Sequence, residues 1–337
     1  MNVVEIRGSF GIDSLTLAQR PEPKLGPGQV VIRVKAASLN YRDLLTVKGQ
    51  YNPKQPLPLI PLSDGVGEVV DIGAGVSRVK TGDRVAGIFA QKWIAGTPSR
   101  QELRSTLGGP LDGMLAEYVV LSEDGVVHVP PHLSDDEAAA LPCAGVTAWS
   151  ALVTDGAIRA GDTVLVQGTG GVSLFALQFA KLAGARVIIT SSSDAKLERA
   201  RQLGASDTIN YKTTPNWDKK AREVTDGAGV DHVVEVGGAG TLAKSLNATR
   251  IGGHVAVIGV LSGTSTSLDV IPILMQKLRV SGVMVGSRET FETMNRAITL
   301  HKLRPVVDKV FGIAEMKDAL RYMESGSHFG KICIRVA

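Results

Sequence analysis

The apolar pattern between residues 164 and 191 predicts a strand, a helix and a second strand. An apolar run at 164–167 leads into a glycine-rich turn at 168–171. Apolar residues then recur at helical spacing up to Gly184, a residue type that commonly ends a helix. The next apolar run, at 187–190, predicts the second strand. This order is that of a βαβ unit.

The N-terminal part of the chain has a different pattern, with short apolar runs separated by turns rich in proline and glycine. It is typical of a compact antiparallel β domain. The composition at 90–112 predicts an exposed loop, whose function the sequence does not indicate. The expected strands are 3–6, 15–19, 30–36, 65–71, 83–88 and 117–121.

From about residue 146 strands and helices alternate, which predicts an α/β fold with a doubly wound parallel sheet. The tail, about 286–337, offers two helices and two strands that either extend this sheet or return to the first domain. Beyond the first βαβ unit, we expect strands at 207–210, 233–236, 254–258 and 280–285, and helices at 194–203, at 217–225 and around Ala243.

Composition and charge exclude several classes of protein. With 337 residues, 44% of them hydrophobic, the chain is long enough for two domains. Its 37 basic and 33 acidic residues are dispersed, so we expect no nucleic-acid partner. No apolar stretch is long enough to span a bilayer and no secretory pattern opens the sequence, so we expect no membrane partner and a cytoplasmic location. The two cysteines, Cys143 and Cys333, indicate no disulfide framework.

The glycine-rich turn predicts a dinucleotide site. A pyrophosphate binds backbone N–H groups at a helix N-terminus, and residues without a Cβ let it come close. Gly168-x-Gly170-x-x-Ser173 fits the dinucleotide pattern except for serine at its last position, where glycine or alanine is usual. The alternative is a tight turn without a ligand. The candidate binding residues are Gly168, Thr169, Gly170, Gly171 and Val172.

The residues after the second strand favour NADP(H) over NAD(H). An acidic residue at this point would bind the ribose 2′-hydroxyl of NAD and would repel a 2′-phosphate. The chain instead has Ser191 and Ser192, followed by Lys196, whose hydroxyl and ammonium groups suit a phosphate. Ser193 precedes a predicted helix, so the alternative role of this serine run is to cap that helix.

Several motifs together resemble the medium-chain dehydrogenase/reductase superfamily, in its zinc-free quinone-oxidoreductase-like branch. The resemblance implies a GroES-like catalytic domain (1–145), a Rossmann cofactor domain (146–285) and a tail (286–337) that returns to the first domain, with the active site in the cleft between domains. The motifs are Val34–Asp43, Pro61–Val69, Gly82–Val85, Leu141–Ala148, the glycine turn and Gly330–Ile332.

The resemblance also implies that this chain holds no zinc. Zinc-dependent relatives hold their catalytic metal with two cysteines and a histidine, but here Asn40 and Ser63 stand at two of these positions and only Cys143 remains. One thiolate does not satisfy a zinc ion. The four cysteines of the structural zinc are absent as well. Cys143 is then either a small buried residue or a reactive thiol.

Without a metal, hydrogen-bond donors must stabilise the negative charge that develops on the acceptor. By position in the family motif, Asn40, Tyr51 and Ser63 are the candidates, and packing beside the cleft is the alternative for Asn40 and Tyr51. Asp43 and Asp64 are expected to orient neighbouring groups. Such donors favour quinones or α,β-unsaturated carbonyl compounds as acceptors.

The remaining cofactor contacts are implied by position in the family. Arg288 and Lys331 have surface charge as an alternative role, and Thr147 an ordinary helical one. The stretch 278–285 could pair with a copy of itself at a sheet edge, so we expect a homodimer. The implied contacts are Thr147, Tyr211, Gly259, Val260, Ser287, Arg288 and Lys331.

The sequence therefore predicts a metal-independent oxidoreductase that transfers hydride from NADPH to a quinone or an α,β-unsaturated carbonyl. Two alternatives stay open. One is an atypical alcohol or aldehyde dehydrogenase with an unconventionally bound metal. The other is a nucleotide-binding protein without turnover.

Overall fold

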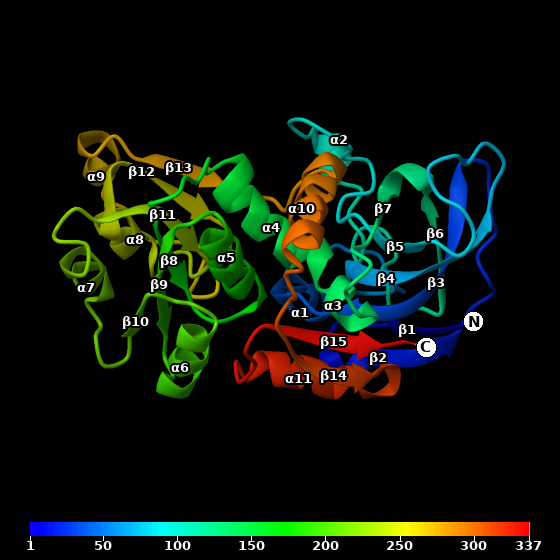
Figure 1. Ribbon diagram of the computed structural model, residues 1–337. Coiled ribbons are helices and arrows are strands. Elements are labelled where there is room, and N and C mark those ends of the chain that lie inside the picture. Colours follow the sequence, from blue (N-terminus) through cyan, green and yellow to red (C-terminus); the bar gives the residue numbers. More distant parts are fainter. Residues whose placement is uncertain (337) are drawn as a thin grey trace. The chain divides into compact units, whose positions relative to one another are not determined.

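The computed structural model describes residues 1–336, which divide into two compact units (Figure 1). The first unit comprises Met1–Val146 together with the chain from Gly286 onward, and the second comprises Thr147–Val285. Strand β15 (Lys331–Arg335) of the tail pairs antiparallel with β3 (Gln29–Ser38), with Cys333 opposite Ser38. The tail therefore returns to the first unit and does not extend the sheet of the second.

A seven-stranded sheet forms the centre of the first unit, in the order β14-β15-β3-β4-β5-β7 with β6 also paired to β3. Buried and half-exposed residues alternate along most of β3, because successive side chains of a strand point to opposite faces. A separate two-stranded sheet contains β1 (Asn2–Ile6) and β2 (Leu15–Gln19). The other strands are β3 (Gln29–Ser38), β4 (Asp64–Ile72), β5 (Arg84–Gly87), β6 (Tyr118–Ser122), β7 (Val126–His128), β14 (Val307–Gly312) and β15 (Lys331–Arg335).

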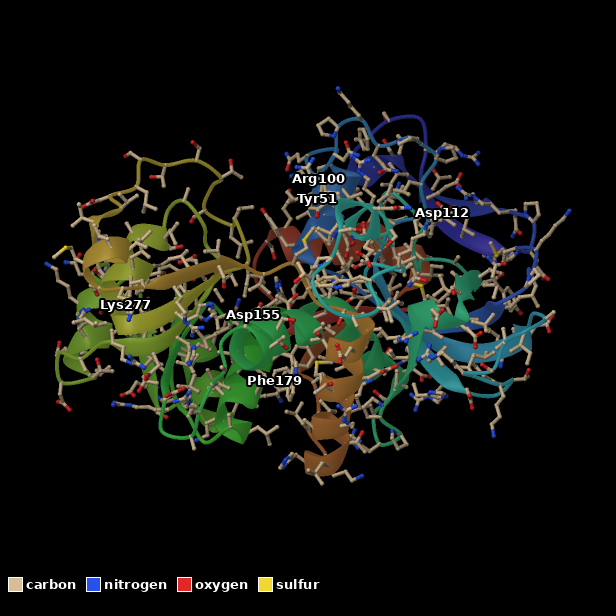
Figure 2. The ribbon with its side chains drawn as sticks, turned by 90° about the horizontal axis from the view of Figure 1, so that it is seen from above. Tyr51, Arg100, Asp112, Asp155, Phe179 and Lys277 are labelled. Carbon is tan, nitrogen blue, oxygen red and sulfur yellow. The ribbon has the colours of Figure 1, made fainter. Side chains whose placement is uncertain are left out.

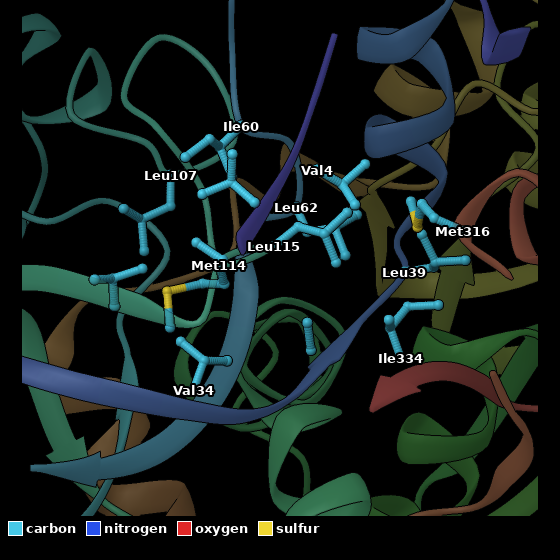
Figure 3. Packing of buried hydrophobic residues seen from close by; sticks show 14 of the residues in the cluster. Val4, Val34, Leu39, Ile60, Leu62, Leu107, Met114, Leu115, Met316 and Ile334 are labelled. Carbon is cyan, nitrogen blue, oxygen red and sulfur yellow. The ribbon is translucent and has the colours of Figure 1, made fainter. Parts of the chain in front are cut away.

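The core of this unit collects side chains from distant parts of the chain. One buried cluster contains Val4 of β1, Val34 of β3, Ile334 of β15 and also Met114, which lies between β5 and β6 (Figure 3). Met316 brings α11 into the same cluster. The helices of the unit are α1 (Tyr41–Val47), α2 (Arg100–Leu103), α3 (Asp135–Ala139), α10 (Arg288–His301) and α11 (Met316–Glu324).

The segment 90–112 differs from the exposed loop that we expected. Residues 105–109 are buried, and Leu107 is part of the hydrophobic core. The α2 helix lies within the segment, where Ser99 and Glu102 cap its first turn reciprocally. Buried Gln91 donates from its amide to the carbonyl oxygens of Ile88 and Gly125, at 2.8 and 3.0 Å. Polar residues satisfied inside the unit explain why the composition alone was misleading.

The second unit contains a six-stranded, wholly parallel sheet in the order β10-β9-β8-β11-β12-β13. The chain runs outward from β8 to one side and then crosses to β11 on the other, so the strand order reverses beside β8. This confirms the predicted doubly wound α/β class. In such sheets ligands bind beyond the carboxyl ends of the strands at this reversal.

No helix among residues 1–336 is long and apolar enough to cross a membrane.

The strands and helices of the second unit follow the predicted alternation closely. The strands are β8 (Thr163–Gln167), β9 (Arg186–Ser191), β10 (Asp207–Asn210), β11 (Val230–Glu235), β12 (Thr249–Val257) and β13 (Arg279–Gly282). The helices are α4 (Val146–Trp149), α5 (Gly171–Leu182), α6 (Asp194–Gln202), α7 (Trp217–Glu223), α8 (Leu242–Ala248) and α9 (Ile271–Met275), with a π-helical turn at Ser150–Thr154.

Candidate active site and cofactor site

The glycine turn joins the carboxyl end of β8 to the N-terminus of α5. Gly168 has a φ of 70°, a conformation that favours glycine. Gly170 is the N-cap of α5, and no side chain caps the helix. A Cβ added at Gly170 would meet no protein atom within 4 Å. The first-turn N–H groups thus adjoin open space at a positive helix end, which fits a dinucleotide pyrophosphate.

The structure explains the serine that departs from the dinucleotide pattern. The hydroxyl of Ser173 donates a hydrogen bond of 2.6 Å to the carbonyl oxygen of Gln167, the last residue of β8. Ser173 is buried, so this bond ties the first turn of α5 to the end of the strand. Glycine or alanine could not form it. Ser173 therefore closes the turn and is compatible with the binding site.

The predicted 2′-phosphate residues lie at the end of β9. Ser191 is buried, and its hydroxyl accepts the N–H of Ser193 at 3.3 Å. Ser193 caps α6 by accepting the N–H of Lys196 at 3.4 Å, which is the alternative role considered for it. The Tyr211 N–H donates to the Ser191 carbonyl at 3.0 Å, so the fold brings these two candidates together. Cofactor contacts by Ser191, Ser192, Lys196 and Tyr211 stay predictions.

In the first unit, four buried side chains form a hydrogen-bonded group that we call the polar cluster: Asn40, Ser63, Asp64 and Lys331. The Lys331 ammonium donates to Asn40 Oδ1 at 2.6 Å and lies 3.8 Å from Asp64 Oδ2. The Asn40 amide donates to Ser63 Oγ at 3.4 Å, and Ser63 Oγ donates to Asp64 Oδ1 at 2.7 Å. The ammonium holds the Asn40 carbonyl oxygen, so the amide NH₂ is the group that the residue presents as a donor.

Two further candidates are attached to the polar cluster. The backbone N–H of Cys143 donates to Asp64 Oδ2 at 3.0 Å. Burial raises the pKa of the Cys143 thiol, and the Asp64 carboxylate raises it further. A raised pKa disfavours the thiolate, which favours the structural role over the reactive one, although the side chain is only half-buried. The N–H of Asn40 donates to Asp43 Oδ2 at 2.8 Å, so Asp43 orients the start of α1 as expected.

Asp43 is predicted to make stability depend on pH. Burial raises the pKa of this carboxyl from 3.8 to about 6, against the opposing effect of Arg42. The folded state binds this proton more tightly than the unfolded state does. The protonated Asp43 therefore contributes its full share to the free energy of unfolding below pH 3.8, and this contribution is lost as pH rises through about 6. The substitution Asp43→Asn removes this loss. Urea unfolding at several pH values should show the variant gaining up to about 2 kcal/mol on the wild type between these limits. A difference in unfolding free energy that is constant with pH would contradict this prediction.

Tyr51 lies outside the polar cluster, beyond the other end of α1. Tyr51 is labelled in Figure 2. Its side chain is 45% exposed, and its ring centroid lies 4.9 Å from the guanidinium carbon of Arg42. Arg42 also contacts the Phe89 ring and donates to the carbonyl oxygens of Leu107 and Gly109. Arg42 therefore links the Tyr51 ring to the buried part of the 90–112 segment. A contact between the Tyr51 hydroxyl and the substrate stays a prediction.

The remaining predicted contacts have varied surroundings. Thr147 is buried in α4. Gly259 and Val260 follow β12, and an added Cβ on Gly259 would come within 2.4 Å of the Val236 carbonyl oxygen, so only glycine fits there. Ser287 caps α10. The Arg288 guanidinium pairs with the Asp124 carboxylate at 2.7 Å. Cofactor binding by these residues and by Lys331 stays a prediction.

The donors in the polar cluster do not fit a zinc ion. The Lys331 ammonium is bonded to Asn40, one of the two residues that stand at zinc-ligand positions, and its positive charge would repel a metal there. Among residues 1–336, no group of three or more His, Cys, Asp or Glu side chains is arranged to hold a metal.

Comparison with known proteins confirms the resemblance found in the sequence. Residues 26–131 match the alcohol dehydrogenase GroES-like domain, and residues 171–299 match the zinc-binding dehydrogenase family. The chain is 43% identical over 333 residues to a zinc-type alcohol dehydrogenase-like protein of Schizosaccharomyces pombe, covering 97% of this chain and 96% of the relative. A quinone oxidoreductase of Pseudomonas aeruginosa is 35% identical over 301 residues, covering 89% of this chain and 83% of the relative.

A solved structure described as an NAD-dependent alcohol dehydrogenase has a TM-score of 0.92 and 36% identity, with 100% of both chains covered. The fold, the glycine turn and these relatives all indicate the same family. The chain belongs to the medium-chain dehydrogenase/reductase superfamily, in its quinone-oxidoreductase-like branch, and is an alcohol dehydrogenase-like oxidoreductase with a GroES-like unit and a Rossmann unit.

Proposed function

We propose that this protein is a metal-independent reductase that uses NADPH to reduce a quinone or an α,β-unsaturated carbonyl compound. The observation that carries the proposal is the bond from the Lys331 ammonium to Asn40 Oδ1, at 2.6 Å. It leaves an amide donor where zinc-dependent relatives place a metal ligand. The likeness to the quinone oxidoreductase of P. aeruginosa supports the same substrate class.

The residues of the chain would act by hydrogen bonding and not as Lewis acids. When bound, the nicotinamide supplies a hydride, and a proton from solvent completes the two-electron reduction of the acceptor. The Asn40 amide would donate to the acceptor oxygen as negative charge develops on it. Lys331 strengthens this donor because its positive charge polarises the amide. Such a donor can stabilise the reduction only of acceptors whose carbonyl group needs little polarisation, such as quinones and α,β-unsaturated carbonyl compounds.

The choice of NADPH rests on the end of β9. Ser191 and Ser192 stand where an acidic residue would bind the ribose of NAD, and the first carboxylate, Asp194, accepts the Asn210 amide at 2.8 Å. The similarity to an NAD-dependent alcohol dehydrogenase favours the other cofactor. We expect NADPH to bind at least about tenfold more tightly than NADH in a fluorescence titration. The substitution Ser192→Asp should weaken NADPH binding and leave NADH binding nearly unchanged. Equal binding of both cofactors by the wild type would contradict the choice.

The substrate class is tested with a panel of quinones, enones, aldehydes and alcohols, by following the absorbance of the reduced nicotinamide. We expect turnover of quinones or enones that chelators do not change. Stoichiometric zinc in the purified protein, with alcohol oxidation, would favour the atypical alcohol or aldehyde dehydrogenase. Cofactor binding without turnover of any compound would favour the non-catalytic nucleotide-binding protein.

We also propose a homodimer formed along β13, the edge strand of the Rossmann sheet. Its outer edge has no partner within the part of the chain that the structure describes. Val280 on this strand is 38% exposed, and Leu274 and Met275 of the neighbouring α9 are 74% and 71% exposed. Pairing with a second copy would cover these apolar side chains. Light scattering should give a dimer for the wild type and a monomer for Val280→Asp, and a monomeric wild type would reject the proposal.

A further inference from the structure

A fully buried carboxylate lies at the carboxyl end of β11, beside the glycine turn. Glu235 is 0% exposed. Its Oε1 accepts the N–H groups of Gly237 and Gly238, at 2.7 and 2.9 Å, and the hydroxyl of Thr241 at 2.6 Å. Its Oε2 accepts the Gln167 amide at 2.7 Å and the hydroxyl of Ser245. Five donors thus stabilise the charge, and a carboxylate is the side chain that accepts all five.

Gln167 links this carboxylate to the glycine turn. Its amide NH₂ donates to Glu235 and to Ser245 Oγ, both at 2.7 Å. Its Oε1 accepts the N–H groups of Val236 and Gly237, both at 3.2 Å. Gln167 directly precedes Gly168, and its own carbonyl accepts the Ser173 hydroxyl. The same two side chains therefore hold the loop 236–241 and the end of the strand that leads into the turn.

The loop 236–241 in turn holds the segment that contains Gly259 and Val260. The Ser262 N–H donates to the Gly237 carbonyl at 2.7 Å, and the Ala239 N–H donates to the Gly263 carbonyl at 3.0 Å. The Gly259 N–H donates to the backbone carbonyl of Glu235 at 3.2 Å. Hydrogen bonds centred on Glu235 thus connect the ends of β8, β11 and β12, where parallel sheets bind their ligands.

We propose that Glu235 is a positioning residue for the dinucleotide: it sets the spacing between the glycine turn and the Gly259–Val260 segment. The proposal rests on the cofactor binding in the proposed function, and Glu235 does not touch the cofactor. A buried network is rigid only when every member is satisfied. Losing the carboxylate would free the loop 236–241 and both segments that bind to it.

The substitution Glu235→Gln tests this role, because no orientation of two facing glutamines satisfies the network. If the amide oxygen of the new Glu235→Gln side chain faces the loop donors, the NH₂ of that side chain meets the NH₂ of Gln167. If Gln167 turns over to relieve this, its NH₂ meets the N–H groups of Val236 and Gly237. The exchange Gln167→Glu with Glu235→Gln keeps one carboxylate and one amide in the pair. It restores a consistent set of donors and acceptors at unchanged net charge.

Asp231→Asn is the matched control. Asp231 lies near the amino end of the same strand, where its Oδ2 accepts the Thr163 N–H at 2.7 Å. The change also turns a carboxylate into an amide, but at the opposite edge of the sheet from the predicted cofactor. Thr241→Val is a milder second variant, since it removes one donor to Glu235 and keeps the shape of the side chain.

The experiment measures dinucleotide dissociation constants by fluorescence and amide hydrogen exchange of the unliganded proteins. We expect Glu235→Gln to raise the dissociation constant about tenfold or more, Thr241→Val about threefold, and the exchanged pair and Asp231→Asn less than about twofold. Amides in 236–241 and 259–263 should exchange faster in Glu235→Gln. If Glu235→Gln fails to fold, tight binding by Thr241→Val or weak binding by the exchanged pair would overturn the role.

The two proposals fail differently. Unchanged binding by Glu235→Gln, or an equal loss in Asp231→Asn, would overturn the positioning role while the proposed function stands. A wild-type protein that binds neither NADPH nor NADH would overturn the proposed function and this role with it.

Discussion

Replacing Asn40 with aspartate is expected to lower kcat for acceptor reduction by about 100-fold or more, the effect of losing a donor to a developing oxyanion. Aspartate has the same shape and still accepts the Lys331 ammonium, which lies 2.6 Å from Oδ1 in the wild type. It has no N–H to donate when ionised. Steady-state kinetics with NADPH and a quinone, above neutral pH so that the carboxyl is ionised, give kcat, and a cofactor titration should give an unchanged dissociation constant.

Asn52→Asp provides the control for this substitution. Asn52 is exposed in the irregular segment that follows α1, and its Oδ1 accepts the N–H of Lys54 at 3.1 Å, a bond that aspartate keeps. This variant should retain the wild-type kcat. A kcat within about threefold of wild type in Asn40→Asp would show that Asn40 only packs beside the site, the alternative that the sequence left open.

Short apolar runs bounded by turn residues predicted most of the strands. The strands at Leu15–Gln19 and Asp207–Asn210 have the expected bounds. The helix α9 (Ile271–Met275) was missed, because it has five residues and none of them is buried, so no helical period of apolar positions marks it. Helix α1 (Tyr41–Val47) was missed as well, although Asn40 and Asp43 carry a capping signal that could have revealed its start.

The candidate site was predicted in part. The motif positions of Asn40 and Ser63 suggested a shared site, and the fold places their side chains 3.4 Å apart. The contact of Lys331 with Asn40 was not predictable from spacing, because it depends on β15 pairing with β3 across nearly the whole chain. The surface-charge alternative for Lys331 was wrong, because its ammonium is buried against Asn40 and the Leu39 carbonyl, within the first unit.

Glu235 was overlooked because it ends an apolar strand and belongs to none of the motifs. Its place was nevertheless a signal, since a buried glutamate needs either a cation or several donors. The next residues include two glycines, Gly237 and Gly238, whose N–H groups supply donors at short range. A single acidic residue at the end of an apolar strand, followed by glycines, could therefore have been read as a loop anchor.

Replacing Gly170 with alanine is expected to raise the dinucleotide dissociation constant about tenfold or more without lowering protein stability. The φ of −80° at Gly170 is allowed for alanine, and the new Cβ would meet no protein atom within 4 Å. The added methyl group can therefore clash only with a ligand that approaches the turn closely. Cofactor fluorescence gives the dissociation constant, and thermal unfolding of the unliganded protein gives the stability.

Gly282→Ala separates this effect from the general cost of adding a methyl group. Gly282 lies in β13 of the same unit, and an added Cβ there also meets no protein atom within 4 Å. Because β13 is also the proposed dimer edge, light scattering must show that Gly282→Ala keeps the wild-type oligomeric state. Both variants should unfold at the wild-type temperature, but only Gly170→Ala should lose cofactor affinity. If both bind the dinucleotide like the wild type, the glycine turn is the ligand-free βα turn that the sequence left open as its alternative. A loss of stability in Gly170→Ala would instead mean that the space beside Gly170 is filled by the protein itself.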